Sequence, residues 1–306
     1  MYDLVIIGSG PAGLSAAVYA KRACLDLVMV EKEPMGGGQM IYTQEVDNYL
    51  GLPGMGGFDL SQKFEEHAKK LNVPTKNGEV ADIQQVRDYW KVVLDSGEAL
   101  ETKTVLLATG SSHRKLEVPG EARLTGAGVS YCATCDGAFF RGKTVAVVGG
   151  GDVALEDALY LAKGCEQVYL IHRRQELRGA KILQEQVEKE SKITFLPDTV
   201  ITEIHGDNKV ESVTLCNKKD KSTKELALDG VFIAVGMNPQ TEAVEKILCL
   251  DHGYVRAGED GITDKPGLFV AGDVRTKRLR QIVTAVADGA NAVTSITDYL
   301  SKYDIL

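Results

Sequence analysis

The chain has 306 residues, of which 44% are hydrophobic and 25% charged, a composition typical of a globular protein large enough for two domains. With a net charge of −8, nothing in the composition suggests the basic surface that binds nucleic acid or anionic lipid. We therefore expect neither nucleic acid nor a membrane among its partners.

The first residues predict a strand rather than a targeting segment. Tyr2–Gly8 is an apolar run leading into a turn, without the basic start, longer apolar stretch and cleavage site of a signal peptide. No apolar run approaches the length of a membrane span. We expect a cytoplasmic protein, in which most of the six cysteines stay as thiols.

The first strand is followed by a glycine loop and by a helix predicted over Leu14–Arg22. Glycines at the first two loop positions allow a sharp turn and a close approach to a pyrophosphate, and a small third residue allows tight packing of helix on strand. The helix N-terminus then offers amide donors to the phosphates. The strand before and the helix after favour a dinucleotide site at Gly8, Gly10, Pro11, Ala12 and Gly13.

The same pattern occurs a second time. A strand predicted over Lys143–Val148 is followed by the loop Gly149-Gly150-Gly151-Asp152 and by a helix predicted over Ala154–Ala162. Ala154 takes the position of the third small residue. We interpret Gly149, Gly151 and Asp152 as part of a second dinucleotide site.

The residue that closes the next strand differs between the two copies. In the first copy it is Glu31, whose carboxylate suits ribose hydroxyls and repels a phosphate on the same sugar. In the second copy it is His172, followed by three guanidinium groups that suit a doubly charged phosphate, those of Arg173, Arg174 and Arg178. We interpret the first site as FAD and the second as NADPH; the alternative is a solvated basic loop.

Each copy of the pattern is completed by a later apolar strand, Thr104–Gly110 in the first and Gly230–Gly236 in the second. Breaks in the chain are expected after these strands, at Pro119-Gly120 and Asn238-Pro239. Gly267–Asp273 predicts a last buried strand that delivers Gly272 and Asp273 to the start of a helix. We predict an α/β fold of two Rossmann-like, three-layer domains. The NADPH domain, 114–238, is inserted into a discontinuous FAD domain, 1–113 and 239–306, over which the segment 80–101 packs as a β-meander.

Cys132-Ala133-Thr134-Cys135 lies fourteen residues before the second glycine loop. A zinc half-site would need two more ligands, and neither a second cysteine pair nor a histidine cluster occurs in the sequence, so we expect no metal. A buried pair of structural thiols is a second alternative. A redox disulfide is favoured, because only two residues separate the cysteines and exchange needs no refolding. Asp136 follows directly and suits a general acid/base.

These motifs together resemble the bacterial, low-molecular-weight NADPH–thioredoxin reductases, a family of FAD-containing pyridine nucleotide-disulfide oxidoreductases. The match covers Ser130–Gly137, the loop Gly149–Glu156, the His172-Arg173-Arg174 motif and Gly272–Ala285. The resemblance implies a homodimer that passes hydride from NADPH to FAD, then to the Cys132–Cys135 disulfide, and finally reduces thioredoxin by dithiol exchange. It further implies that one domain rotates on the other between half-reactions. We expect the breaks near 114–120 and 236–239 to be the hinges, because hinges are short segments at the ends of elements.

The resemblance also implies roles for individual residues. Cys135 would lie nearer the flavin, Cys132 would attack thioredoxin, and Asp136 would donate the proton to the departing thiolate. The candidate FAD contacts are Gly8, Gly10, Pro11, Ala12, Gly13, Glu31, Gln39, Asn48, Gly110, Gly272, Asp273, Arg280, Gln281 and Ile282. The candidate NADPH contacts are Gly149, Gly151, Asp152, His172, Arg173, Arg174 and Arg178. One departure is Val153, where the family commonly has a serine that could contact a phosphate.

Three alternatives remain beside this function. A ferredoxin-dependent flavin thioredoxin reductase and a dithiol oxidase would both be expected to lack the nicotinamide site, whereas this chain keeps its three arginines. A nucleotide-binding redox sensor would carry an effector or DNA-binding segment, and none is evident beyond the two predicted domains.

Overall fold

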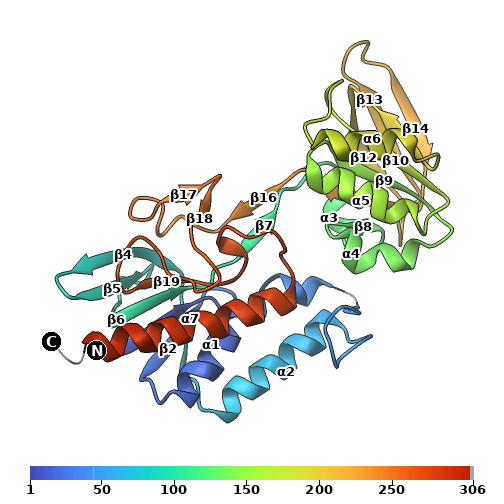
Figure 1. The fold of residues 1–306 in the computed structure, drawn as a ribbon. Coiled ribbons are helices and arrows are strands. Elements are labelled where there is room, and N and C mark those ends of the chain that lie inside the picture. Colours follow the sequence, from blue (N-terminus) through green and yellow to red (C-terminus); the bar gives the residue numbers. More distant parts are fainter. Residues whose placement is uncertain (44, 304–306) are drawn as a thin grey trace. The chain divides into compact units, whose positions relative to one another are not determined.

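The computed structural model describes residues 1–43 and 45–303, and the chain divides into two compact units. Unit 1 consists of Met1–Ser112 and Asn238–Leu306, and unit 2 of His113–Met237. The second unit is thus inserted into the first (Figure 1). These boundaries lie one residue from those expected from the sequence.

A parallel sheet forms the centre of unit 1. Its strands follow the spatial order β3 (Thr75–Asn77), β2 (Leu27–Glu31), β1 (Tyr2–Ile7), β6 (Ala99–Leu107) and β19 (Leu268–Val270). The inner strands are buried on both faces, which explains why they are nearly continuous apolar runs. This order is that of a Rossmann-like sheet.

Helices cover one face of this sheet. Alternate strand residues, including Leu4, Ile6 and Met29, share a core with α1 (Pro11–Arg22) and α7 (Ile282–Tyr303). The two helices approach closely at Gly289, where a Cβ atom would lie 2.2 Å from the Ala12 carbonyl oxygen. α2 (Gly57–Lys70) and the short 3-10 helix η1 (Gly38–Tyr42) complete this layer.

The opposite face is covered by the predicted β-meander. β4 (Val80–Val86) and β5 (Tyr89–Leu94) pair antiparallel with each other, and β5 pairs with β6. Trp90 and Val92 share a core with Val5 and Ile7 of β1. The meander is therefore continuous with the central sheet, because β6 belongs to both. A small hairpin follows later, formed by β17 (Leu250–Asp251) and β18 (Tyr254–Val255).

Unit 2 repeats the three-layer scheme. Its parallel sheet has the order β11 (Ile193–Leu196), β10 (Gln167–Ile171), β9 (Thr144–Gly149), β15 (Gly230–Ala234) and β8 (Val129–Ser130). One face packs on α5 (Asp152–Ala162) and α6 (Lys181–Lys189). The other packs on an antiparallel sheet of β12 (Thr199–His205), β13 (Ser212–Asn217) and β14 (Thr223–Ala227). The predicted fold class, with two Rossmann-like sheets and one unit inserted in the other, is confirmed.

The chain passes between the units along two short strands, β7 (Ser111–His113) and β16 (Met237–Pro239), which pair as a two-stranded sheet. The expected break at Asn238-Pro239 therefore lies within a strand. The break at Pro119-Gly120 lies inside unit 2, just before the short helix α3 (Glu121–Leu124). The buried Glu121 carboxylate accepts the backbone N–H groups of residues 116, 117 and 118, so much of the expected hinge 114–120 is held within unit 2.

No helix in the described ranges, 1–43 and 45–303, is long and apolar enough to cross a membrane.

Candidate active site

The first glycine loop joins β1 to α1 in unit 1. Gly8 has φ 104°, and a Cβ atom there would lie 2.5 Å from the Ala108 carbonyl oxygen. A Cβ on Gly13 would lie 1.9 Å from the Gly8 carbonyl oxygen, so both positions require glycine. Gly10 caps the helix, and a Cβ atom there would lie 3.9 Å from its nearest neighbour, the Gly38 Cα. The helix begins at Pro11, three residues earlier than predicted, because the fixed φ of proline suits the first helical position.

Glu31 closes β2, as expected, and is already bonded to the glycine loop. Its Oε2 accepts hydrogen bonds from the Ser9 N–H and from the Ser9 hydroxyl, both at 2.7 Å. Its Oε1 accepts the N–H of Glu33 at 2.9 Å. Ser9 therefore fixes the carboxylate beside the loop, a contact that sequence reasoning missed because serine has no required place in the glycine pattern.

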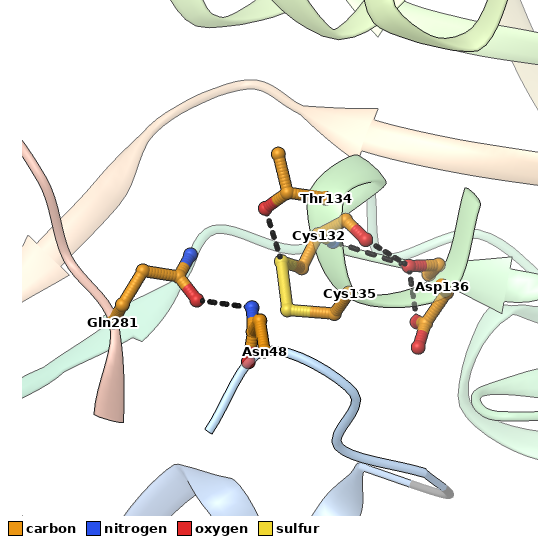
Figure 2. The surroundings of a disulfide bond; sticks show 7 residues. Asn48, Cys132, Thr134, Cys135, Asp136 and Gln281 are labelled. Carbon is orange, nitrogen blue, oxygen red and sulfur yellow. Dashed lines mark hydrogen bonds between the residues drawn. A yellow bond between two sulfur atoms is a disulfide. The ribbon is translucent and has the colours of Figure 1, made fainter. Parts of the chain in front are cut away.

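Further candidate residues of unit 1 come from distant parts of the chain. The Asn48 side-chain amide donates to Gln281 Oε1 at 2.9 Å, a pair drawn in Figure 2. Gln39 Nε2 donates to the Ser111 carbonyl. Gly110 has φ 70°, in the conformation that favours glycine. The Arg280 guanidinium lies 4.0 Å from the centre of the Tyr254 ring, next to Gln281 and to Ile282 at the start of α7.

Asp273 lies in a short 3-10 helix, η3 (Gly272–Val274), directly after β19. The helix that we expected to start at this point is only the short η3, and α7 starts nine residues after Asp273, at Ile282. Asp273 Oδ1 is buried and accepts no hydrogen bond from the described residues. Burial raises the pKa of this carboxyl, and Lys277 and Arg280 oppose the shift.

The second glycine loop in unit 2 has the expected close contacts. A Cβ on Gly149 would lie 2.5 Å from the Ala234 carbonyl oxygen and 2.6 Å from the Ala154 Cβ, whereas Gly151 has open space. α5 begins at Asp152, two residues earlier than predicted. Asp152 Oδ1 accepts the Ala180 N–H at 2.6 Å, so this carboxylate ties the loop to the segment after Arg178.

The basic motif of unit 2 divides into a buried histidine and exposed arginines. His172 is 4% exposed, its ring lies against Gly150, and its Nε2 has no hydrogen-bond partner within the described part of the chain. Burial lowers the pKa of His172, and the three arginines lower it further. The Gly150 carbonyl oxygen accepts the Arg178 N–H at 2.7 Å, which links the glycine loop directly to the basic segment. Arg173, Arg174 and Arg178 are exposed.

Cys132 and Cys135 form a disulfide in unit 2 (Figure 2). Cys132 caps the short helix α4 (Ala133–Asp136), which follows β8 and Tyr131. Both cysteines are half-buried, and Cys132 Sγ lies 3.4 Å from the Thr134 hydroxyl. The 3-10 helix η2 (Gly137–Phe140) continues from α4.

Asp136 is held beside the disulfide by Ser130, which is buried at the end of β8. The Ser130 hydroxyl donates to Asp136 Oδ2 at 2.6 Å and accepts the Cys132 N–H at 3.1 Å. Burial raises the pKa of Asp136, and the hydrogen bond from Ser130 opposes that shift. The result is a carboxyl group suited to carrying a proton next to two sulfur atoms.

Sequence reasoning missed Ser130, although it stands inside the quoted motif, because its partner is six residues away across a turn. It also missed Asp288, whose carboxylate is buried on α7. Among the residues that the structure describes, no three histidine, cysteine, aspartate or glutamate side chains gather as a metal site.

Comparisons with known proteins show the class to which the chain belongs. The model of the pyridine nucleotide-disulphide oxidoreductase family matches residues 2–289. Thioredoxin reductase of Bacillus subtilis is 42% identical over 304 residues, which cover 99% of this chain and 96% of that protein.

Solved structures agree. Thioredoxin reductase of Streptococcus pyogenes has 44% identity and a TM-score of 0.93, with 99% of both chains covered. That of Lactococcus lactis, described as in the FR conformation, has 42% identity and a TM-score of 0.69, covering 99% of this chain and 100% of that one. The chain belongs to the low-molecular-weight thioredoxin reductases within the pyridine nucleotide-disulphide oxidoreductase family.

Proposed function

We propose that this protein is an NADPH-dependent thioredoxin-disulfide reductase that uses FAD. The observation that carries the proposal is the half-buried Cys132–Cys135 disulfide, with the Asp136 carboxyl fixed beside it by Ser130. The unit that holds this disulfide also holds a nucleotide loop, and the other unit holds a second one. A disulfide that receives electrons from two bound dinucleotides accounts for the disulfide and for both nucleotide loops.

The residues of unit 1 fit a bound flavin dinucleotide. The loop Gly8–Gly13 and the N-terminus of α1 suit its pyrophosphate, and Glu31 suits a ribose. The orphaned, buried Asp273 Oδ1 is an acceptor suited to a hydroxyl of the ribityl chain. Asn48 and Gln281, already bonded to each other, and Gln39 would complete the site. When bound, the flavin would supply the two-electron carrier between the nicotinamide and the disulfide.

The residues of unit 2 fit NADPH. Gly151 leaves room for a pyrophosphate at the start of α5. The three exposed arginines, anchored to the glycine loop through the Arg178 N–H, suit the extra phosphate that distinguishes NADPH from NADH. Asp152 has one oxygen committed to Ala180, so we assign it the role of positioning this loop rather than contacting phosphate.

The reduced cysteines perform the exchange. Cys132 attacks one sulfur of the thioredoxin disulfide as a thiolate, forming a mixed disulfide and releasing the other sulfur as a thiolate. Asp136 donates a proton to that leaving group. Because Ser130 occupies Oδ2, Oδ1 is the oxygen that carries the proton. Cys135 then attacks Cys132, the internal disulfide re-forms, and thioredoxin leaves as a dithiol.

We also propose rotation of one unit on the other between half-reactions, and a homodimer. The rotation is supported by the crossing of the chain on only two short strands, β7 and β16. It is supported further by the structure of the Lactococcus lactis thioredoxin reductase, which is described as one particular conformation, the FR conformation. The homodimer is based on the family resemblance.

A coupled assay tests the proposal. The purified holoenzyme is given NADPH or NADH and each of several thioredoxin-like proteins, and Arg178→Gln is assayed beside wild type. We expect turnover with a thioredoxin and a preference for NADPH that falls about tenfold in the variant, since it loses one charged contact to phosphate. No flavin bleaching by NADPH would favour a ferredoxin-dependent enzyme or an oxidase. Bleaching without protein-disulfide turnover would favour a sensor.

A further inference from the structure

A buried group of charged residues surrounds the turn that carries Asp273. At its centre is Asp288 of α7, which is 4% exposed. Its carboxylate accepts hydrogen bonds from the Gly272 N–H at 3.0 Å, from Lys277 Nζ at 2.8 Å, and from Arg275 Nε and Nη2 at 2.9 and 2.6 Å. Three of these donors bond Oδ2 and one bonds Oδ1, so the charge of Asp288 is paired with two cations within the protein.

Asp273 differs from Asp288 in this respect. The two carboxylates share two nearby cations, but Asp273 Oδ1 accepts no hydrogen bond from any residue that the structure describes and lies 4.0 Å from Lys277 Nζ. The same ammonium group lies 2.8 Å from Asp288. Attraction between buried charges grows as the distance between them shortens, and the ammonium group also donates a hydrogen bond to Asp288, so Lys277 stays with the nearer carboxylate. One acid is fully paired, and the other is left as an open acceptor.

We propose that Asp288 is a positioning residue for flavin binding: it holds Lys277 away from Asp273 and so keeps Asp273 Oδ1 available to a ligand hydroxyl. This role rests on the proposed function, in which unit 1 binds FAD. Without the Asp288 charge, the nearest carboxylate for Lys277 is Asp273. The lysine would then occupy the acceptor, and the flavin would have to displace it.

Asp288 also fixes the backbone of the same turn. Gly272 has φ 81°, and its N–H is bonded to Asp288. A Cβ on Gly272 would lie 2.9 Å from the Ala12 Cβ, and a Cβ on Gly289, the residue of α7 after Asp288, would lie 2.2 Å from the Ala12 carbonyl oxygen. One turn of α7 therefore fixes the position of Gly272, just before Asp273, and packs against the first turn of α1 after the glycine loop.

The test compares FAD binding by deflavinated protein, followed by flavin fluorescence. We expect Asp288→Asn to weaken FAD binding about tenfold. A change of this size corresponds to the loss of one charge-assisted hydrogen bond, here the bond between Asp273 and the flavin hydroxyl. Asp298→Asn is the matched control, because Asp298 is an exposed residue of the same helix, and it should bind as wild type does. Circular dichroism of the deflavinated proteins shows whether each variant is folded.

A second variant separates positioning from a general loss of structure. In Asp288→Asn/Lys277→Met the competing ammonium is absent, so FAD affinity should return to within about threefold of wild type. The Lys277→Met variant alone should bind FAD at least as well as wild type. Equal affinity of wild type and folded Asp288→Asn would overturn this role alone, and so would a double variant no better than Asp288→Asn. Failure of the wild-type protein to take up FAD would instead overturn the proposed function.

Discussion

At the scale of single residues, the chemistry of the disulfide depends on one hydroxyl group. Ser130 bonds both Asp136 and the Cys132 N–H, so it sets the proton affinity of the acid and the position of the attacking cysteine together. Cys132, Cys135 and Asp136 could be predicted because they are adjacent in sequence and their types define the chemistry. Ser130 and Asp288 could not, because their roles depend on contacts that only the folded chain creates.

We expect Ser130→Ala to move the Asp136 limb of the pH–activity profile toward higher pH. The reason is that the Ser130 hydrogen bond lowers the pKa of Asp136 against the effect of burial, and its loss leaves burial unopposed. The measurement is kcat/KM for thioredoxin as a function of pH. Ser130→Thr keeps a hydroxyl and should restore the wild-type profile. An unchanged limb in Ser130→Ala would show that the hydroxyl does not act on this acid.

At the scale of elements, two features determine where helices lie: a proline at the first helical position, and glycines that allow close packing. The sequence predicted α1 and α5 but not their first turns, because Pro11 and Asp152 were assigned to the preceding loops. The position of α7 could not be predicted from Asp273, because a 3-10 turn and an irregular stretch separate the two. The place where α7 meets α1, at Gly289, has no local signature.

Gly289→Ala tests the packing of α7 on α1. In an exposed helix this change stabilises by up to about 1 kcal/mol, but here the new Cβ would lie 2.2 Å from the Ala12 carbonyl oxygen. We expect a net destabilisation of about 1–3 kcal/mol and a lower thermal midpoint. Ala287→Val, at an exposed position on the same helix, is the control and should change the midpoint far less. A stabilised Gly289→Ala protein would contradict this packing.

We expect Asp157, on α5, to make the stability of the folded protein depend on pH. Burial, assisted by the neighbouring Glu156 charge, raises the pKa of Asp157 from 3.8 to about 7. The folded protein therefore retains a proton that the unfolded chain loses, and this contribution to stability, complete below about pH 4, disappears as pH rises through about 7. Asp157→Asn should have a higher urea midpoint than wild type at pH 8, and the two should converge near pH 4.

The control for this pH series is Glu188→Gln, which removes an exposed acid from α6 of the same unit. It shows how the urea midpoint responds to the removal of an acid that is not buried. A constant difference between Asp157→Asn and wild type from pH 4 to 8 would show that Asp157 titrates normally in the folded protein.

At the scale of the whole molecule, the fold could be predicted because the sequence contains the same nucleotide-binding pattern twice. Two glycine loops, two closing strands and the difference between Glu31 and His172 predicted two Rossmann-like units and their order along the chain. The positions at which the chain passes from one unit to the other were harder to predict, because proline and glycine indicate turns wherever they occur. Pro119-Gly120 marks a turn inside unit 2, and the passage itself runs through the paired strands β7 and β16.

The central claim is that electrons leave the protein through one pair of sulfur atoms. The most direct test is anaerobic reduction of the holoenzyme by NADPH, followed by addition of oxidised thioredoxin, in wild type, Cys132→Ser and Cys249→Ser. Cys249 is an exposed free thiol and serves as the control. We predict that wild type and Cys249→Ser reduce thioredoxin through repeated turnovers, whereas Cys132→Ser binds flavin, accepts electrons from NADPH and reduces no thioredoxin. Undiminished thioredoxin reduction by Cys132→Ser would contradict the account.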